Sequence, residues 1–162
     1  MYLYVTLDGP IGGRDKRKKR GMEKVLHSAF RDINIDYRSV YYWFYVMKQT
    51  YKGSCHCGKV QFEVEADLDH VRVCDCSICR RRGALIHRVE EKSFRLLTPI
   101  EELSLYQWHT KTAKDYFCPT CGILTFRRPR TAPELWGVNV RCLEGLDISS
   151  IPIEYVYGSR LD

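Results

Sequence analysis

The sequence predicts one mainly β domain, built of short antiparallel sheets and stapled by bound zinc. Two observations predict this fold class. Short stretches alternate apolar and polar residues, and seven of the eight cysteines fall into three tight clusters. The chain has 162 residues, which is enough for a single domain with a buried core. After residue 50 there is no long helical periodicity and no internal repeat.

The clearest strand pattern is VQFEVEA at residues 60–66, where every second residue is apolar and the others are Gln or Glu. WGVNVRC at residues 136–142 alternates in the same way, and its apolar residues are expected to face the core. This follows because successive side chains of a strand point to opposite faces. Shorter strand candidates, separated by Gly, Pro and Asp, are residues 84–89, 103–108, 123–126 and 153–157.

Residues 1–46 differ from the rest of the chain. They contain no cysteine, and their nine Lys/Arg against five Asp/Glu supply four of the six net positive charges. Residues 22–33 could form a short amphipathic helix. The segment from Met47 resembles the start of a natural protein. We therefore expect a zinc domain at residues 47–162, preceded by a basic extension that is disordered or belongs to a mis-assigned start.

The basic run RDKRKKR at residues 14–20 could bind nucleic acid, but a solvated tail is the expected role. It is not followed by the apolar region of a signal peptide. The longest apolar run, residues 40–47, is far shorter than the roughly 20 residues of a membrane helix. These observations predict a cytoplasmic protein with no membrane partner.

Cysteine spacing predicts metal binding rather than disulfide bonds. The clusters are CHC at residues 55–57, CDCSIC at 74–79 and CPTC at 118–121. A CxxC pair can turn both sulfur atoms toward one ion, and such pairs in a chain without a secretion signal favour zinc. An ordinary zinc ribbon is a poor match, because 38 residues separate the second cluster from the third.

The seven cysteines divide into two sets, which predicts two zinc ions per chain. The central triplet is close enough in sequence to hold one ion alone, and the outer clusters then form a second site. A closed four-cysteine site is structural, whereas a site with an open position can perform chemistry. The expected structural ligands are Cys55, Cys57, Cys118 and Cys121, and the expected catalytic ligands are Cys74, Cys76 and Cys79.

The fourth position of the triplet is expected to hold water or a substrate thiol. No histidine stands at ligand spacing beside it, and His56 is expected to point away from the metal. A ligand role for His87 or His109 is a weaker alternative to a surface or pocket role. The eighth cysteine, Cys142, is expected to be a buried core thiol.

Basic residues near the clusters could balance the charge of the site. Arg80, Arg81 and Arg82 follow the triplet directly and could offset three thiolates or bind a substrate carboxylate. The alternative is that at least two of them are simply solvated. Lys111 and Lys114 are further pocket candidates.

Four motifs resemble the glutathione-dependent formaldehyde-activating enzyme family, which also includes centromere protein V. They are GSCHCGKVQFEV, CDCSICRRRGA, YFCPTCGI and GVNVRCLEG, and the resemblance covers about residues 50–148. It implies a β-tent fold and the same division into structural and catalytic zinc ligands. It also implies a carbon–sulfur lyase that joins glutathione and formaldehyde into S-(hydroxymethyl)glutathione.

Two functions from different classes therefore remain. The first is a zinc-dependent lyase that acts on a thiol–aldehyde adduct, with glutathione as its small-molecule partner. The second is a zinc-stabilised binding module without turnover, associated with nucleic acid through residues 14–20. The triplet distinguishes them, because an exchangeable fourth position favours the enzyme and a fourth protein ligand favours the module.

Overall fold

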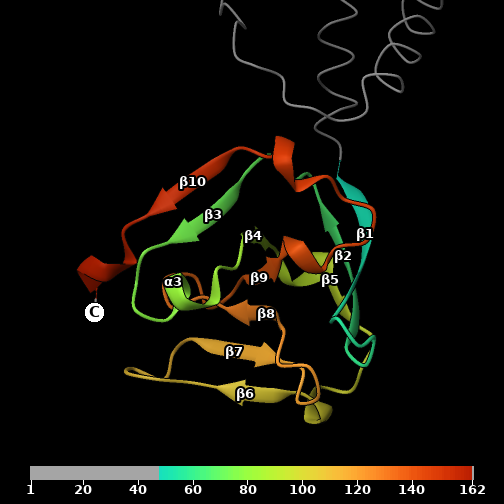
Figure 1. Cartoon of the computed structure of the whole chain (residues 1–162), viewed down its shortest axis with the longest axis horizontal. Helices are drawn as coiled ribbons and strands as arrows, with labels where there is room; N and C mark the ends of the chain where they lie inside the picture. Colours follow the sequence, from blue (N-terminus) through green and yellow to red (C-terminus); the bar gives the residue numbers. More distant parts are fainter. Residues whose placement is uncertain (1–47, 162) are drawn as a thin grey trace, which may run out of the picture.

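The computed structural model describes residues 48–161, and strands dominate this part of the chain (Figure 1). The smaller of its two sheets has three antiparallel strands in the order β1-β2-β5. These strands are β1 (Gln49–Ser54), β2 (Gln61–Ala66) and β5 (Phe94–Leu96).

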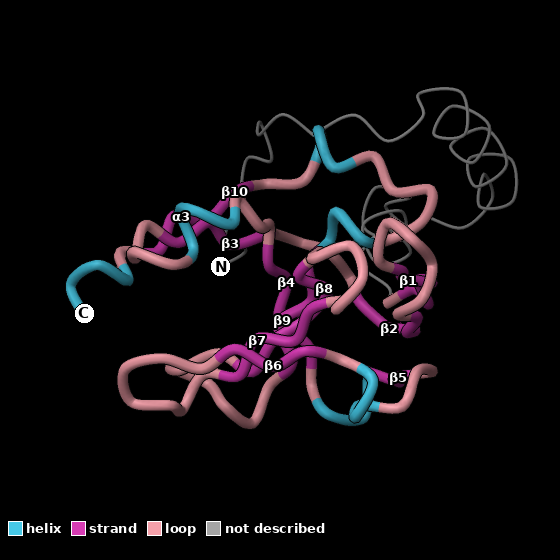
Figure 2. Tube along the Cα trace, turned by 60° about the horizontal axis from the view of Figure 1, so that its bottom comes forward, coloured by secondary structure: helices cyan, strands magenta, loops and turns pink. Residues whose placement is uncertain are grey.

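The larger sheet has seven strands in the order β10-β3-β4-β9-β8-β7-β6 (Figures 1 and 2). All neighbours are antiparallel except β10 and β3, which are parallel. The predicted mainly β fold of antiparallel sheets is thus confirmed, with one parallel pair added. The strands are β3 (Val71–Cys74), β4 (Ile86–Val89), β6 (Ser104–Tyr106), β7 (Lys114–Phe117), β8 (Leu124–Arg128), β9 (Trp136–Asn139) and β10 (Ile153–Val156).

Helical structure in residues 48–161 is limited to single turns. The α-helical turn α3 (Cys79–Arg82) lies between the β10–β3 side and the β7–β6 side of the large sheet in Figure 1. The 3₁₀ turns are η1 (Glu91–Ser93), η2 (Ile100–Glu102), η3 (Val140–Cys142), η4 (Ile148–Ser150) and η5 (Gly158–Leu161).

The alternation predicted for residues 60–66 is confirmed, because Val60, Phe62 and Val64 are fully buried on one face. The pattern at residues 136–142 is a strand only as far as Asn139. There the Asn139 side chain accepts a hydrogen bond from the backbone N–H of Arg141 at 3.3 Å, and the chain turns into η3. The burial of the apolar residues was therefore predicted correctly, but the length of the strand was not, and Gly137 and Asn139 are buried as well.

An aromatic cluster joins the two sheets. Phe62 and Phe94 come from the small sheet, and Phe126 and Trp136 come from the large one. The ring of Phe94 lies 4.8 Å from those of both Phe126 and Trp136, measured between centroids. This packing covers one face of the large sheet and leaves the opposite face to form a pocket.

Several predictions concern residues that lie outside the described part of the chain. These are the basic run at 14–20, the helix at 22–33 and the separate character of residues 1–46. Between residues 48 and 161, no helix is both long and apolar enough to cross a membrane.

Candidate metal centres and the adjoining pocket

Two reverse turns bring four cysteines together. The first turn joins β1 to β2, and the N–H of Gly58 donates to the carbonyl of Cys55 at 3.1 Å. The second joins β7 to β8, and the N–H of Gly122 donates to the carbonyl of Cys118 at 2.9 Å. Gly122 has a φ of 73°, in the left-handed region that glycine adopts without strain. Each turn thereby contributes two sulfur atoms to a common point.

The sulfur atoms of Cys55, Cys57, Cys118 and Cys121 all lie within 4.8 Å of one another. Cys57 Sγ is 3.5 Å from Cys55 Sγ and 3.6 Å from Cys118 Sγ. Tetrahedral zinc with bonds of about 2.3 Å needs sulfur separations of roughly 3.8 Å, and a disulfide needs only about 2.05 Å. The donor set therefore fits a closed zinc site, grouped as the spacing predicted, and its occupancy by zinc stays a prediction.

The predicted triplet also comes together. Cys74 ends β3, Cys76 lies in the next turn and Cys79 begins α3, and the three sulfur atoms lie within 4.8 Å of one another. Among residues 48–161, no other Cys, His, Asp or Glu joins this group. Three thiols can bind a tetrahedral zinc ion and leave its fourth coordination position open, so this group fits an open zinc site.

The C-terminal segment packs directly against the triplet. The N–H of Asp75 donates to the carbonyl of Val156 on β10 at 3.1 Å. Beyond β10, a Cβ atom on Gly158 would lie only 2.4 Å from Cys74 Sγ and 3.2 Å from Cys76 Cβ. A residue without a side chain is needed for this close approach.

Burial and hydrogen bonding act in opposite directions on these thiols. Burial disfavours the thiolate of Cys76, but hydrogen bonds from the backbone and side chain of Cys79 hold the pKa of Cys76 below its usual value. Burial raises the pKa of Cys79 to about 12, although the positive charge of Arg127 acts to lower it. In the other group, the backbone N–H of Ile123 lowers the pKa of Cys121 to about 6. Each group thus has a thiol whose pKa is lowered, and metal binding would displace protons from the thiols that remain protonated.

A chain of charged groups links the triplet to β7. Arg127 on β8 donates from Nη1 to Cys79 Sγ at 3.0 Å, and its Nε forms an ion pair with Asp115 Oδ1 at 2.9 Å. Asp115 is only 1% exposed, and its Oδ2 lies 2.6 Å from Arg82 Nη1. A carboxylate between two guanidinium groups holds both of them in place, so Asp115 positions Arg127 against the sulfur.

The triplet lines a pocket of about 110 Å³ on the face of the large sheet that turns away from the aromatic core. Residues from β3, β4 and β8 form its floor, and the β6–β7 loop contributes Trp108 and His109 to one wall. No Asp or Glu is among the lining residues, whereas five arginines are: Arg72, Arg82, Arg88, Arg127 and Arg130. The pocket is therefore strongly basic beside three sulfur atoms.

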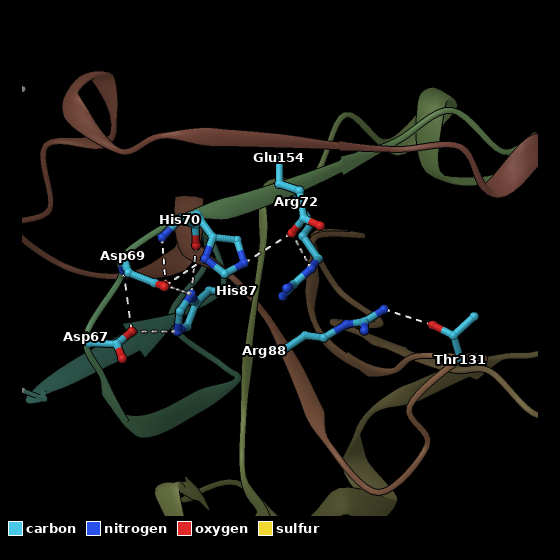
Figure 3. A network of polar contacts seen from close by, with 8 residues as sticks. All are labelled: Asp67, Asp69, His70, Arg72, His87, Arg88, Thr131 and Glu154. Atoms are coloured by element: carbon cyan, nitrogen blue, oxygen red, sulfur yellow. Dashed lines mark hydrogen bonds and ion pairs between the residues drawn. The ribbon is translucent and has the colours of Figure 1, made fainter. Parts of the chain in front are cut away.

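None of the three histidines considered as a fourth ligand joins the triplet. His56 is exposed in the β1–β2 turn. His87 is 5% exposed, and its Nδ1 lies 2.8 Å from the carbonyl oxygen of His70 while its Nε2 lies 3.4 Å from Asp67 Oδ1 (Figure 3). His109 lines the pocket, which is the role expected for it in place of ligation.

The basic residues suggested by the sequence are only partly at the pocket. Arg80 and Arg81 are exposed and do not line it, so Arg82 is the sole member of this run that does. The suggestion of Lys111 and Lys114 was wrong, because neither lines the pocket. Lys114 is exposed at the start of β7, and the next residue, Asp115, points inward instead.

Cys142 belongs to neither group, as predicted. It is buried in η3 and its thiol donates to the carbonyl of Leu124 at 3.7 Å. Burial raises the pKa of Cys142 to about 12, so the thiol stays protonated.

The fold and these groups define a β domain with one closed and one open cluster of cysteines. Residues 50–157 match the family model described as glutathione-dependent formaldehyde-activating enzyme. A crystal structure of a Rhodobacter sphaeroides protein is 45% identical, and the match covers 64% of this chain and 99% of that chain with a TM-score of 0.59. The chain belongs to the glutathione-dependent formaldehyde-activating enzyme family, as the sequence motifs predicted.

Proposed function

We propose that the protein is a zinc-dependent carbon–sulfur lyase that acts on a thiol–formaldehyde adduct such as S-(hydroxymethyl)glutathione. The observation that carries this proposal is the open side of the three-cysteine group, which faces a pocket. A closed four-ligand site has no position for a substrate, whereas a three-ligand site has one.

The four-cysteine group has a structural role in this proposal. Cys55 and Cys57 lie between β1 and β2, and Cys118 and Cys121 lie between β7 and β8. An ion bound to all four would tie the small sheet to the large one, and its binding energy would stabilise the fold.

Zinc bound by the triplet would supply a position at which a substrate thiol loses its proton and becomes a nucleophile. The thiolate sulfur attacks the carbonyl carbon, so that a carbon–sulfur bond forms and the carbon–oxygen π bond breaks. The oxygen takes up the proton that the thiol lost, and the reverse reaction cleaves the adduct. Arg127 offsets negative charge at Cys79, and His109 is our candidate for carrying the proton.

A zinc-stabilised binding module remains the alternative, but it needs a fourth protein ligand at the triplet. The described part of the chain offers none. The basic run on which nucleic-acid binding would depend, residues 14–20, lies outside residues 48–161. The open triplet therefore favours the enzyme.

Zinc analysis and exchange NMR test the proposal together. The protein should contain two zinc ions per chain, and it should accelerate exchange between formaldehyde and its glutathione adduct. Cys76→Ser should lose one zinc ion and at least about 100-fold of the catalysed rate, because the site loses a ligand. Cys142→Ser is the matched control, since it removes a cysteine from neither group.

The control should keep both zinc ions and most of the activity. A wild-type protein with two zinc ions that does not accelerate exchange would reject the lyase. A Cys76→Ser protein with full activity would reject the triplet as the active site.

A further inference from the structure

Within the described residues, three arginines of the pocket form ion pairs with carboxylates, whereas Arg88 on β4 does not. Arg72 pairs with Glu154 at 2.8 Å, and Arg82 and Arg127 share Asp115. For Arg88 the partner is the neutral hydroxyl of Thr131, to which its Nη2 donates at 3.0 Å (Figure 3). No carboxylate of residues 48–161 lies within ion-pair distance of it.

Arg88 lies among charges of both signs, but none of the described carboxylates forms a direct ion pair with it. The residue is half-buried, and it lines the pocket together with Arg72 and Arg127. Burial is the largest cause that holds the pKa of Arg88 below its usual value; the charge of Arg72 and then that of Arg127 act in the same direction, and those of Glu154 and Glu134 oppose them. A partly desolvated cation beside two others is stabilised by an anion in direct contact. The described chain provides only the Thr131 hydroxyl at hydrogen-bonding distance, while Glu154 and Glu134 act from farther away.

We propose that Arg88, held in position by Thr131, binds a carboxylate of the thiol substrate. The inference rests on the proposed function and adds the residue that would select thiols carrying a carboxylate. Guanidinium groups pair with carboxylates through two parallel hydrogen bonds. Because the Thr131 contact uses one nitrogen, Nη2, other N–H groups of Arg88 remain for a ligand.

The charge of the whole pocket supports this class. Among Arg72, Arg82, Arg88 and Arg127, which line it, Asp115 and Glu154 offset two of the four charges. Three thiolates around a divalent ion offset one more, so positive charge remains. A carboxylate-bearing thiol supplies the missing negative charge, and a neutral thiol does not.

Binding of a non-reactive ligand separates recognition from chemistry. S-methylglutathione keeps both carboxylates but has no thiol, and its diethyl ester has neither carboxylate. We expect the zinc-loaded full chain to bind the diacid at least about tenfold more tightly than the diester, measured by calorimetry.

Arg88→Gln should weaken binding of the diacid by roughly tenfold to 100-fold, the effect of losing a charge-assisted hydrogen bond. Arg95→Gln is the matched control, because it removes the same charge from the exposed Arg95–Glu63 pair on the small sheet. The control should bind the diacid like the wild type. Zinc content and circular dichroism show whether each variant is folded.

The subsite is rejected if Arg88→Gln binds the diacid as tightly as the wild type does. It is also rejected if the wild type binds the diacid no better than the diester, or binds neither. This comparison of two ligands uses only the wild type, so it does not depend on the folding of a variant. Arg88-dependent binding without turnover would support the subsite and reject the lyase. Equal kcat/KM for glutathione and its diethyl ester would support the lyase and reject the subsite.

Discussion

At the scale of single residues, the basic side of the pocket depends on one buried carboxylate. Asp115 is almost fully buried and pairs with both Arg82 and Arg127. Arg127 in turn donates to Cys79 Sγ. Because each arginine needs this carboxylate to offset its charge, loss of Asp115 would affect both the fold and the triplet.

Asp115→Asn should lower the free energy of unfolding by about 3–5 kcal/mol, the usual effect of removing one partner from a buried ion pair. Urea unfolding of the zinc-loaded protein measures this. Asp147→Asn is the control, because Asp147 is exposed and asparagine can still accept the hydrogen bond from the N–H of Ser149. The control should leave the free energy of unfolding close to that of the wild type. A loss below about 1 kcal/mol for Asp115→Asn, the range of exposed pairs, would contradict the buried role.

Residues at the site differ in how far the sequence reveals them. The cysteines could be predicted, because CxC and CxxC are local patterns whose spacing sets their geometry. Asp115 and Arg127 could not, since Arg127 reaches Cys79 across 48 positions and no local pattern marks either residue. Arg88 was missed for the same reason, although its place in a strand candidate was correct.

At the scale of elements, the two groups of cysteines differ in what they connect. The triplet takes its ligands from β3, the next turn and α3, which adjoin in the chain. The four-cysteine group joins two turns more than 60 residues apart, since Cys57 and Cys118 are separated by 61 positions. Metal binding in the second group therefore closes a long loop, and in the first it orders a short one.

Cys118→Ser should therefore lower the free energy of unfolding by more than about 4 kcal/mol, as the loss of a structural metal can do. Cys76→Ser should cost less stability, although each variant should lose one zinc ion. Chemical unfolding and zinc analysis of the two proteins test the difference. Equal losses of stability would show that the two groups do not divide into structural and catalytic sites.

Strand boundaries were the weakest part of the prediction at this scale. Residues 136–142 alternate throughout, yet β9 ends at Asn139 because the side chain of that residue bonds to the backbone of the next turn. The strands β3, β5 and β7 have only three or four residues, too few for alternation to mark them, and pairing with neighbours defines them instead.

At the scale of the whole molecule, one core holds both sheets. It runs from Cys55 to Ile151 and includes the aromatic contacts between β2, β5, β8 and β9. The family match, residues 50–157, spans this core and both groups of cysteines. Residues 48–161 therefore contain the elements that we expect to be needed for folding and for metal binding.

A chain shortened to begin at Met47 should keep both zinc ions and the unfolding midpoint of the full chain. The reason is that all seven proposed ligands lie beyond this residue, together with the core that residues 48–161 form among themselves. Zinc analysis and thermal unfolding of the two chains compare them directly. Precipitation of the shorter chain, or loss of a zinc ion, would show that residues 1–46 stabilise the domain.

The sequence by itself determined the fold class, the family and the grouping of the cysteines. The fold class and the three clusters depend on local spacing, either the two-residue period of strands or the short gaps within the clusters. The four-cysteine group followed because the triplet can hold one ion alone and leaves the two outer clusters to share the other. Only the tertiary structure decided which charges reach the open side of the triplet. Arg72, Arg88 and Arg127 come from three strands, and the sheet order β3-β4-β9-β8 brings them to one pocket. Sheet order depends on contacts between distant segments, which no local spacing encodes.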